Sequence, residues 1–295
     1  MSRDLEAHAW LRYAKEDLDA AELLLKSRFY RHALFWVEQA SEKILKVYII
    51  APHVKELISK LDSIIDHCKS PGINNEDIEK LKKLRNKIIE FLNPKKFQHI
   101  CGKKIKEVEN FFDMYREAIS HPYVCKALRE SSDIRKRMSV NRYRKVFREV
   151  EKLIGKAVKT IQTQSMPRCE EPDASYIVQL LQNTEERADE VRKIISNIAQ
   201  ETLQKYKGDE IAEQAILDCC CAYLTFLDEI AVMPYFELHA YICQFFEITR
   251  YPGDRGIPKD VIDNMPRIIS LLRKNLERVK RLVVSNIDTS RESSG

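Results

Sequence analysis

Apolar residues recur along this chain at alternating steps of three and four positions, which is the spacing of one face of an α-helix. The pattern is clearest between residues 10 and 50, where two stripes follow one another: Leu11, Ala14, Leu18, Ala21 and Leu25, then Ala33, Val37, Ala40, Ile44 and Val47. No sustained alternation of period two, which would indicate strands, occurs anywhere. The sequence therefore predicts an all-α protein that begins with a helical hairpin.

The same pattern predicts further helices, and turn signals separate them. In the N-terminal part these helices cover about residues 54–65, 75–91 and 105–119, and the last two end before Asn93-Pro94 and His121-Pro122. Five amphipathic helices joined by short turns are typical of an antiparallel bundle.

The C-terminal part contains four more predicted helices. A long helix capped by Asp173 or Ser175 ends near Gly208, and an apolar helix over 210–232 follows it. A short helix then reaches Ile248, and a final one runs from Ile262 to Val283. We expect two bundles joined by a basic segment, with these boundaries: 1–122, a first helical bundle; 123–172, a basic helical connector and polar linker; 173–287, a second helical domain; 288–295, a disordered tail.

Composition narrows the class of protein. Seven glycines in 295 residues are few for folds that depend on tight turns or phosphate-binding loops. The N-terminus has no apolar core of a signal peptide, and no stretch is apolar over the length of a membrane span, so we expect a cytoplasmic protein without membrane contact. The eight cysteines show neither Cys-x-x-Cys pairs nor zinc-ligand spacing, so we expect small buried thiols, no metal and no cofactor.

Positive charge is concentrated in one segment. Residues 126–159 contain twelve lysines and arginines against four acids, a local net charge of +8, whereas the whole chain carries only +5. Clustered cations neutralise phosphates, and the interleaved Tyr143 is of a type that stacks on unpaired bases. The alternative is a solvated connector whose charges pair with acids elsewhere. The candidate nucleic-acid-binding residues are Arg135, Lys136, Arg137, Arg142, Arg144, Lys145 and Arg148.

The hairpin resembles the HEPN domain of prokaryotes. Its residues follow that family's order: Asp17-Leu18-x-x-Ala21-x-x-Leu24-Leu25, then Tyr30, Ala33 and Phe35, then Gln39-Ala40-x-Glu42-Lys43-x-Leu45-Lys46, with His53 and Leu57 at the next helix. Residues 249–254, Thr-Arg-Tyr-Pro-Gly-Asp, are similar to a loop before the last helix of archaeal members. The resemblance implies a five-helix bundle at the N-terminus and, in the C-terminal half, a diverged second domain of the same kind.

The resemblance also implies a place for an active site. Catalytic HEPN proteins are metal-independent ribonucleases whose Arg-x4–6-His motif lies in a cleft between two paired domains. The matching residues here are Arg85 and Asn86, with Glu90 at the position of the histidine. A glutamate near an arginine has a lowered pKa and repels phosphate, so we expect a degenerate site. A solvated helix face is the alternative explanation of these residues.

Two other Arg/His pairs have the required spacing, Arg3 with His8 and Arg116 with His121. Chance alone produces between one and two such pairs in a chain of this composition, so Arg116 and His121 are only minor candidates for catalysis.

Three functional hypotheses follow. The first is a non-catalytic or weakly active RNA-associated module, dimeric, in a toxin–antitoxin or defence setting where the family commonly pairs with a minimal nucleotidyltransferase. The second is an active metal-independent ribonuclease. The third is a protein-interaction or nucleotide-binding scaffold with no role on RNA.

Overall fold

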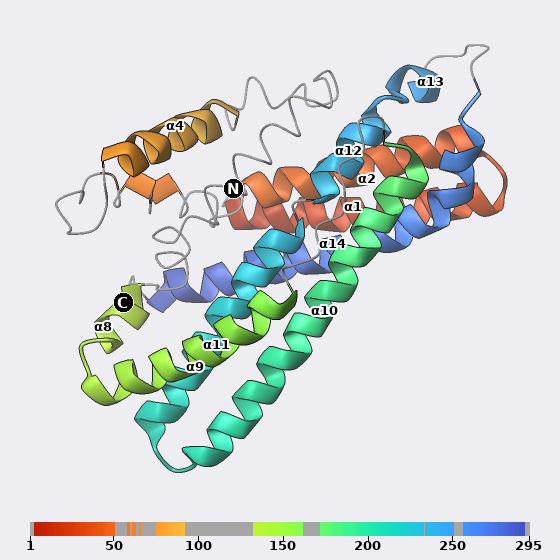
Figure 1. Ribbon diagram of the computed structural model, residues 1–295. Coiled ribbons are helices and arrows are strands. Elements are labelled where there is room, and N and C mark those ends of the chain that lie inside the picture. Colours follow the sequence, from red (N-terminus) through yellow and green to blue (C-terminus); the bar gives the residue numbers. More distant parts are fainter. Residues whose placement is uncertain are drawn as a thin grey trace. The chain divides into compact units, whose positions relative to one another are not determined.

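A computed structural model of the chain describes residues 3–50, 58–59, 61–62, 65, 75–91, 132–161, 172–232, 234–250 and 256–292. Its helices are α1 (Arg3–Lys26), α2 (Tyr30–Ile50), α4 (Asn75–Phe91), α8 (Ser132–Arg137), α9 (Asn141–Ile161), α10 (Ala174–Lys205), α11 (Glu210–Val232), α12 (Pro234–Cys243), α13 (Phe246–Arg250) and α14 (Lys259–Glu292) (Figure 1). These residues contain no strand, and the predicted all-α class is confirmed. None of their helices is both long enough and apolar enough to pass through a bilayer.

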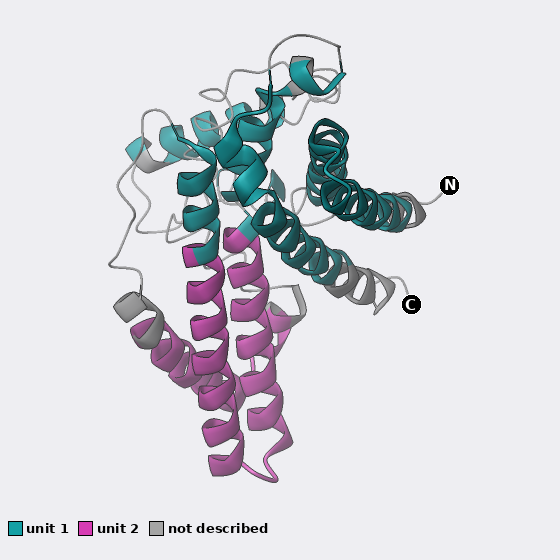
Figure 2. Ribbon diagram, turned by 90° about the vertical axis from the view of Figure 1, so that its right-hand side faces the viewer, with its two compact units in different colours: residues 1–118, 169–182, 232–295 teal, residues 119–168, 183–231 magenta. Residues whose placement is uncertain are grey.

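The chain forms two compact units that are not consecutive in the sequence (Figure 2). Unit 1 consists of residues 1–118, 169–182 and 232–295, and unit 2 consists of residues 119–168 and 183–231. The helices α10 and α11 therefore each contribute residues to both units.

The limits of these units differ from the domain boundaries predicted from the sequence. The basic segment is not a separate connector between two bundles. It contains α9, whose apolar residues pack in the core of unit 2. The predicted C-terminal domain is divided, because its last helices pack with the N-terminal hairpin. Each amphipathic helix buries its apolar stripe against whichever stripe is available in space, whatever the order in the chain.

The N-terminal hairpin forms the centre of unit 1. Helices α1 and α2 pack along each other, α14 lies against both, and α12 and α13 contact α2 (Figure 1). The predicted stripe residues are buried, except Leu25, which is partly exposed: Leu11, Ala14, Leu18, Ala21, Ala33, Val37, Ala40, Ile44 and Val47. The alanines in both stripes allow the two helix backbones to approach closely.

The turn between α1 and α2 ends the first helix with a Schellman motif. The backbone N–H of Phe29 donates to the carbonyl of Leu24 at 2.8 Å, and that of Arg28 donates to the carbonyl of Leu25 at 3.0 Å. Arg28 occupies the left-handed position of this motif with φ of 62°. Glycine is the usual residue there, and a side chain in this conformation costs roughly 1 kcal/mol.

In unit 2, α9 packs its apolar stripe against α10 and α11. Tyr143 and Phe147 are 2% and 1% exposed, and their rings stack with centroids 6.0 Å apart. Helical spacing in the sequence predicts an apolar stripe over Val146, Val150, Leu153, Ala157 and Ile161. Leu153, however, is 43% exposed, and the buried residue is instead Ile154. The correction follows from helical geometry, because residue 154 lies seven and four positions after 147 and 150 and so shares their face.

Caps fix the ends of the long helices where the sequence predicted them. The carboxylate of Asp173 accepts a hydrogen bond from the backbone N–H of Tyr176 at 2.7 Å, so Asp173 is the cap of α10. Gly208 has φ of +86°, and Asp209 caps α11 by accepting from the N–H of Ala212 at 3.0 Å.

Two C-terminal predictions differ from the structure. The short helix expected after Pro234 is divided into α12 and α13, and α14 continues to Glu292, so the predicted disordered tail is helical over residues 288–292. Neither glycine nor proline occurs between residues 267 and 292, so no residue there stops the helix.

Candidate functional site

The family-like motif lies on α4, and its arginine is already engaged. The Arg85 Nε donates to the Asp62 carboxylate at 2.7 Å, and its Nη1 donates to the Asn86 side-chain oxygen at 3.2 Å. An incoming phosphate would have to compete with this carboxylate for the guanidinium. The Glu90 side chain lies outside the described residues, as do Arg116 and His121.

Several basic residues of the segment around α9 form ion pairs within unit 2. Arg137 donates to Asp218 at 2.7 Å, and Arg142 donates to Asp209 at the same distance. The side chain of Arg135 lies outside the described residues. The carboxylate of Asp209 has its pKa lowered by the backbone N–H of Ala212 and by Arg142, so it is held as an anion. Part of the basic excess is therefore neutralised by acids on and beside α11.

The remaining basic residues of this segment lie on the surface of α8 and α9. Lys136, Arg144 and Lys145 are exposed, and Arg148 pairs with Glu151 at 2.5 Å one turn along α9. Exposed cations on the surface of a helix can contact phosphates without any rearrangement of the core.

The proposed stacking role of Tyr143 is wrong. Its ring lies in the core of unit 2, and its hydroxyl donates to the Asp218 carboxylate at 2.6 Å. Burial, together with this hydrogen bond to an anion, raises the pKa of the Tyr143 hydroxyl well above its ordinary value. The sequence pattern that suggested an interleaved aromatic is the core stripe of α9, so this ring cannot meet a base.

Two residues of the family-like pattern form a buried ion pair inside the hairpin. Lys43 on α2 donates to the Asp17 carboxylate on α1, and these side chains are 16% and 9% exposed. Burial raises the pKa of Asp17, and the hydrogen bond and charge of Lys43 act in the opposite direction. This pair explains physically why the two helices carry an acid and a base at these positions.

Arg250, from the loop that resembles archaeal members, also belongs to unit 1. Its Nη2 lies 3.3 Å from the carboxylate of Glu38 on α2, and its guanidinium lies 5.7 Å from the centre of the Phe35 ring. Residues 251–255 lie outside the described residues. Arg250 therefore links α13 to α2, so a helix from the C-terminal part of the chain packs against the N-terminal hairpin.

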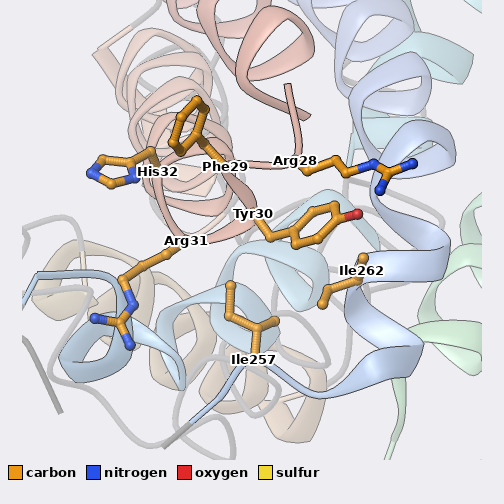
Figure 3. A pocket seen from close by; sticks show the side chains of 7 residues that line it. All are labelled: Arg28, Phe29, Tyr30, Arg31, His32, Ile257 and Ile262. Carbon is orange, nitrogen blue, oxygen red and sulfur yellow. The ribbon is translucent and has the colours of Figure 1, made fainter. Parts of the chain in front are cut away.

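A pocket beside the α1–α2 turn was missed by sequence reasoning (Figure 3). Those of its lining residues that the structure describes are basic, aromatic or aliphatic, and none of them is acidic: Arg28, Phe29, Tyr30, Arg31, His32, Ile257 and Ile262. The available signal was the run Arg-Phe-Tyr-Arg-His, where aromatic and cationic residues alternate between two predicted helices. Within the described part of the chain, no three acidic, histidine or cysteine side chains converge as metal ligands.

Comparison with known protein families matches residues 7–118 to the HEPN domain. The match includes α1, α2 and α4, and it confirms the resemblance of the N-terminal part. Searches of curated proteins and of solved structures find no match to the chain.

Proposed function

We propose that the HEPN domain formed by residues 7–118 is an RNA-associated module that does not cleave RNA. An association with RNA in general is what the domain itself supports. The further claim is that the domain does not cleave RNA. One observation supports this claim: the motif arginine, Arg85, is bound to the carboxylate of Asp62.

The chemistry of the motif explains why this pairing matters. Cleavage requires a base that moves the 2′-hydroxyl proton and a cation that holds the scissile phosphate. Arg85 donates from Nε to Asp62, and five residues further along α4 the chain has Glu90 in place of histidine. A carboxylate bound to the guanidinium opposes the approach of a phosphate, and a glutamate that replaces an imidazole is a weaker base at neutral pH.

The resemblance to the family supports a proposal for the biological setting. We propose that the protein is a HEPN protein of the archaeal type that acts in the cytoplasm, in a toxin–antitoxin or defence system. In this proposal it forms a homodimer and pairs with a minimal nucleotidyltransferase. An inactive HEPN domain would there bind RNA or its partner without degrading transcripts.

The surface of unit 2 supplies further proposed contacts with RNA. Arg144 and Lys145 are exposed on the outer face of α9 and are the best placed of the predicted basic residues. Neutralising both should weaken RNA binding and lower its dependence on salt by about one ion for each phosphate that these cations neutralise. Neutralising Arg142, which pairs with Asp209, should have a smaller effect on the same quantities.

A cleavage assay with single-stranded RNA in the presence of a chelator tests the proposal. We expect the wild-type protein to bind the RNA and to leave it intact. Cleavage that is abolished by Arg85→Ala but kept by Lys83→Ala, which removes an exposed charge from the same helix, would establish the active ribonuclease instead. Absence of RNA binding even at low salt would favour the scaffold without a role on RNA.

A further inference from the structure

The pocket beside the α1–α2 turn contains the one non-glycine residue with positive φ in the described part of the chain, Arg28. Glycine would satisfy the Schellman hydrogen bonds of Phe29 and Arg28 without strain. Backbone strain of this kind persists only where the surrounding structure enforces it, and strained positions cluster at functional sites. The side chain of Arg28 lines the pocket, so its guanidinium is placed to bind a ligand there (Figure 3).

The electrostatics of the pocket are those of an anion site. Arg28, Arg31 and His32 line it, and none of the lining residues that the structure describes is acidic. The first turn of α2 also contains no acid. The N-terminus of a helix carries partial positive charge, and Arg31 and His32 in the first turn of α2 add cationic and imidazole side chains to this end.

The shape of the pocket suits a planar group between two anions. The ring of Tyr30 lies between Arg28 and Arg31, whose side chains extend to opposite sides of it, and Ile257 and Ile262 lie on one side of the ring (Figure 3). The pocket has a volume of about 390 Å³, within the usual range for small-ligand sites. Phe29, beside it, is 57% exposed.

We propose that this pocket binds single-stranded RNA, with one base against Tyr30 and the isoleucines and the two flanking phosphates at Arg28 and Arg31. The proposal rests on the proposed association with RNA and adds the place and the form of the ligand. An unpaired strand is favoured over a duplex because only an unpaired base can leave its stack and lie on a tyrosine ring. It is favoured over an acidic peptide because the centre of the pocket is aromatic and aliphatic.

The decisive variant is Arg28→Gly, because it separates binding from folding. It removes the guanidinium and also the strained side chain, so we expect a higher thermal unfolding midpoint together with a roughly tenfold weaker affinity for RNA. Asparagine also tolerates this conformation, and Arg28→Asn should lose affinity for RNA to a similar extent. Lys15→Ala is the matched control, since it removes an exposed charge from α1, the helix before the turn, and it should change affinity less than twofold.

Fluorescence anisotropy with a short labelled oligouridine, repeated over a series of salt concentrations, measures these effects. We expect Arg28→Gly to lower the salt dependence by about one ion, Tyr30→Leu to weaken binding with little change in salt dependence, and duplex RNA to bind more weakly than the single strand.

The outcomes separate the two proposals. If the wild-type protein binds no RNA, the proposed function fails and this site fails with it. If the wild-type protein binds RNA and Arg28→Gly binds it equally well, or Lys15→Ala is weakened as much as Arg28→Gly, only the pocket is refuted. Binding of an oligoglutamate with the same dependence on Arg28, in place of RNA, would also refute it and indicate an acidic protein partner.

Discussion

The buried ion pair between Asp17 and Lys43 offers the sharpest test of how the hairpin is stabilised. The pair joins α1 to α2, and both side chains are largely withdrawn from water, at 9% and 16% exposure. Removing one partner leaves the other charge in a poorly hydrated place. The perturbations are Asp17→Leu, Lys43→Met and the double variant that combines them.

The burial of the pair decides the expected magnitude. An exposed ion pair contributes at most about 1 kcal/mol, but removing one member of a buried pair costs about 3–5 kcal/mol. Since Lys43 retains some exposure and a long flexible chain, we expect about 3 kcal/mol for Asp17→Leu, at the lower end of that range. The double variant should cost less than either single one, because two apolar side chains of similar size leave no charge without a partner.

Urea unfolding followed by tryptophan fluorescence reports on this unit alone. The chain contains two tryptophans, Trp10 and Trp36, and both lie on the hairpin. Free energies of unfolding from the midpoint and slope then give the coupling energy of the pair in a double-mutant cycle.

The pH dependence supplies a second measurement. Burial raises the pKa of Asp17 from its ordinary value of 3.8, so its protonated form is favoured in the folded state and its ionisation costs stability as the pH rises through the folded pKa. In Lys43→Met the compensating charge is gone, so the cost of this variant should be largest at neutral pH and shrink as the pH falls. Single variants that cost under about 1 kcal/mol, or a coupling energy near zero, would refute a buried pair.

Further predictions concern unit 2. Ile154→Ala should destabilise the protein by about 2–5 kcal/mol, whereas Leu153→Ala should cost at most about 0.5 kcal/mol, because Ile154 is fully buried and Leu153 is 43% exposed; equal losses in thermal unfolding would contradict the register of α9. Hydrogen bonds from Lys205 and Tyr206 lower the pKa of Glu149 below its ordinary 4.5, so the stability from this contact should be present above that value and should disappear as the pH falls through the folded pKa. Glu149→Gln should therefore flatten the acid side of the stability profile, and a variant with an unchanged acid slope would show that this contact contributes nothing.

The local pattern predicted most of the helices because each depends on residues close in the chain. The hairpin stripes, the Asp173 cap and the limits of α11 all follow from a 3.6-residue period and from cap chemistry. The position of the motif on α4 was also predictable, since Arg85 and Asn86 are neighbours within one helix.

The predictions that changed depended on contacts between distant residues. The sequence could not show that Arg85 meets Asp62, or that the ring of Tyr143 lies in a core formed with α10 and α11. A basic and aromatic stretch has the same composition whether its rings face solvent or a neighbouring helix, so only the packing distinguishes the two.

By itself, the sequence determined that this protein is all-α, that it opens with a helical hairpin and that this hairpin resembles a HEPN domain. The tertiary structure decided which helices share a unit and which cations are neutralised. It also decided that Arg28, Tyr30 and Arg31 line one pocket with Ile257 and Ile262. The physical reason is range: backbone periodicity acts over a few residues, whereas burial and ion pairing depend on which surfaces meet after the chain has folded.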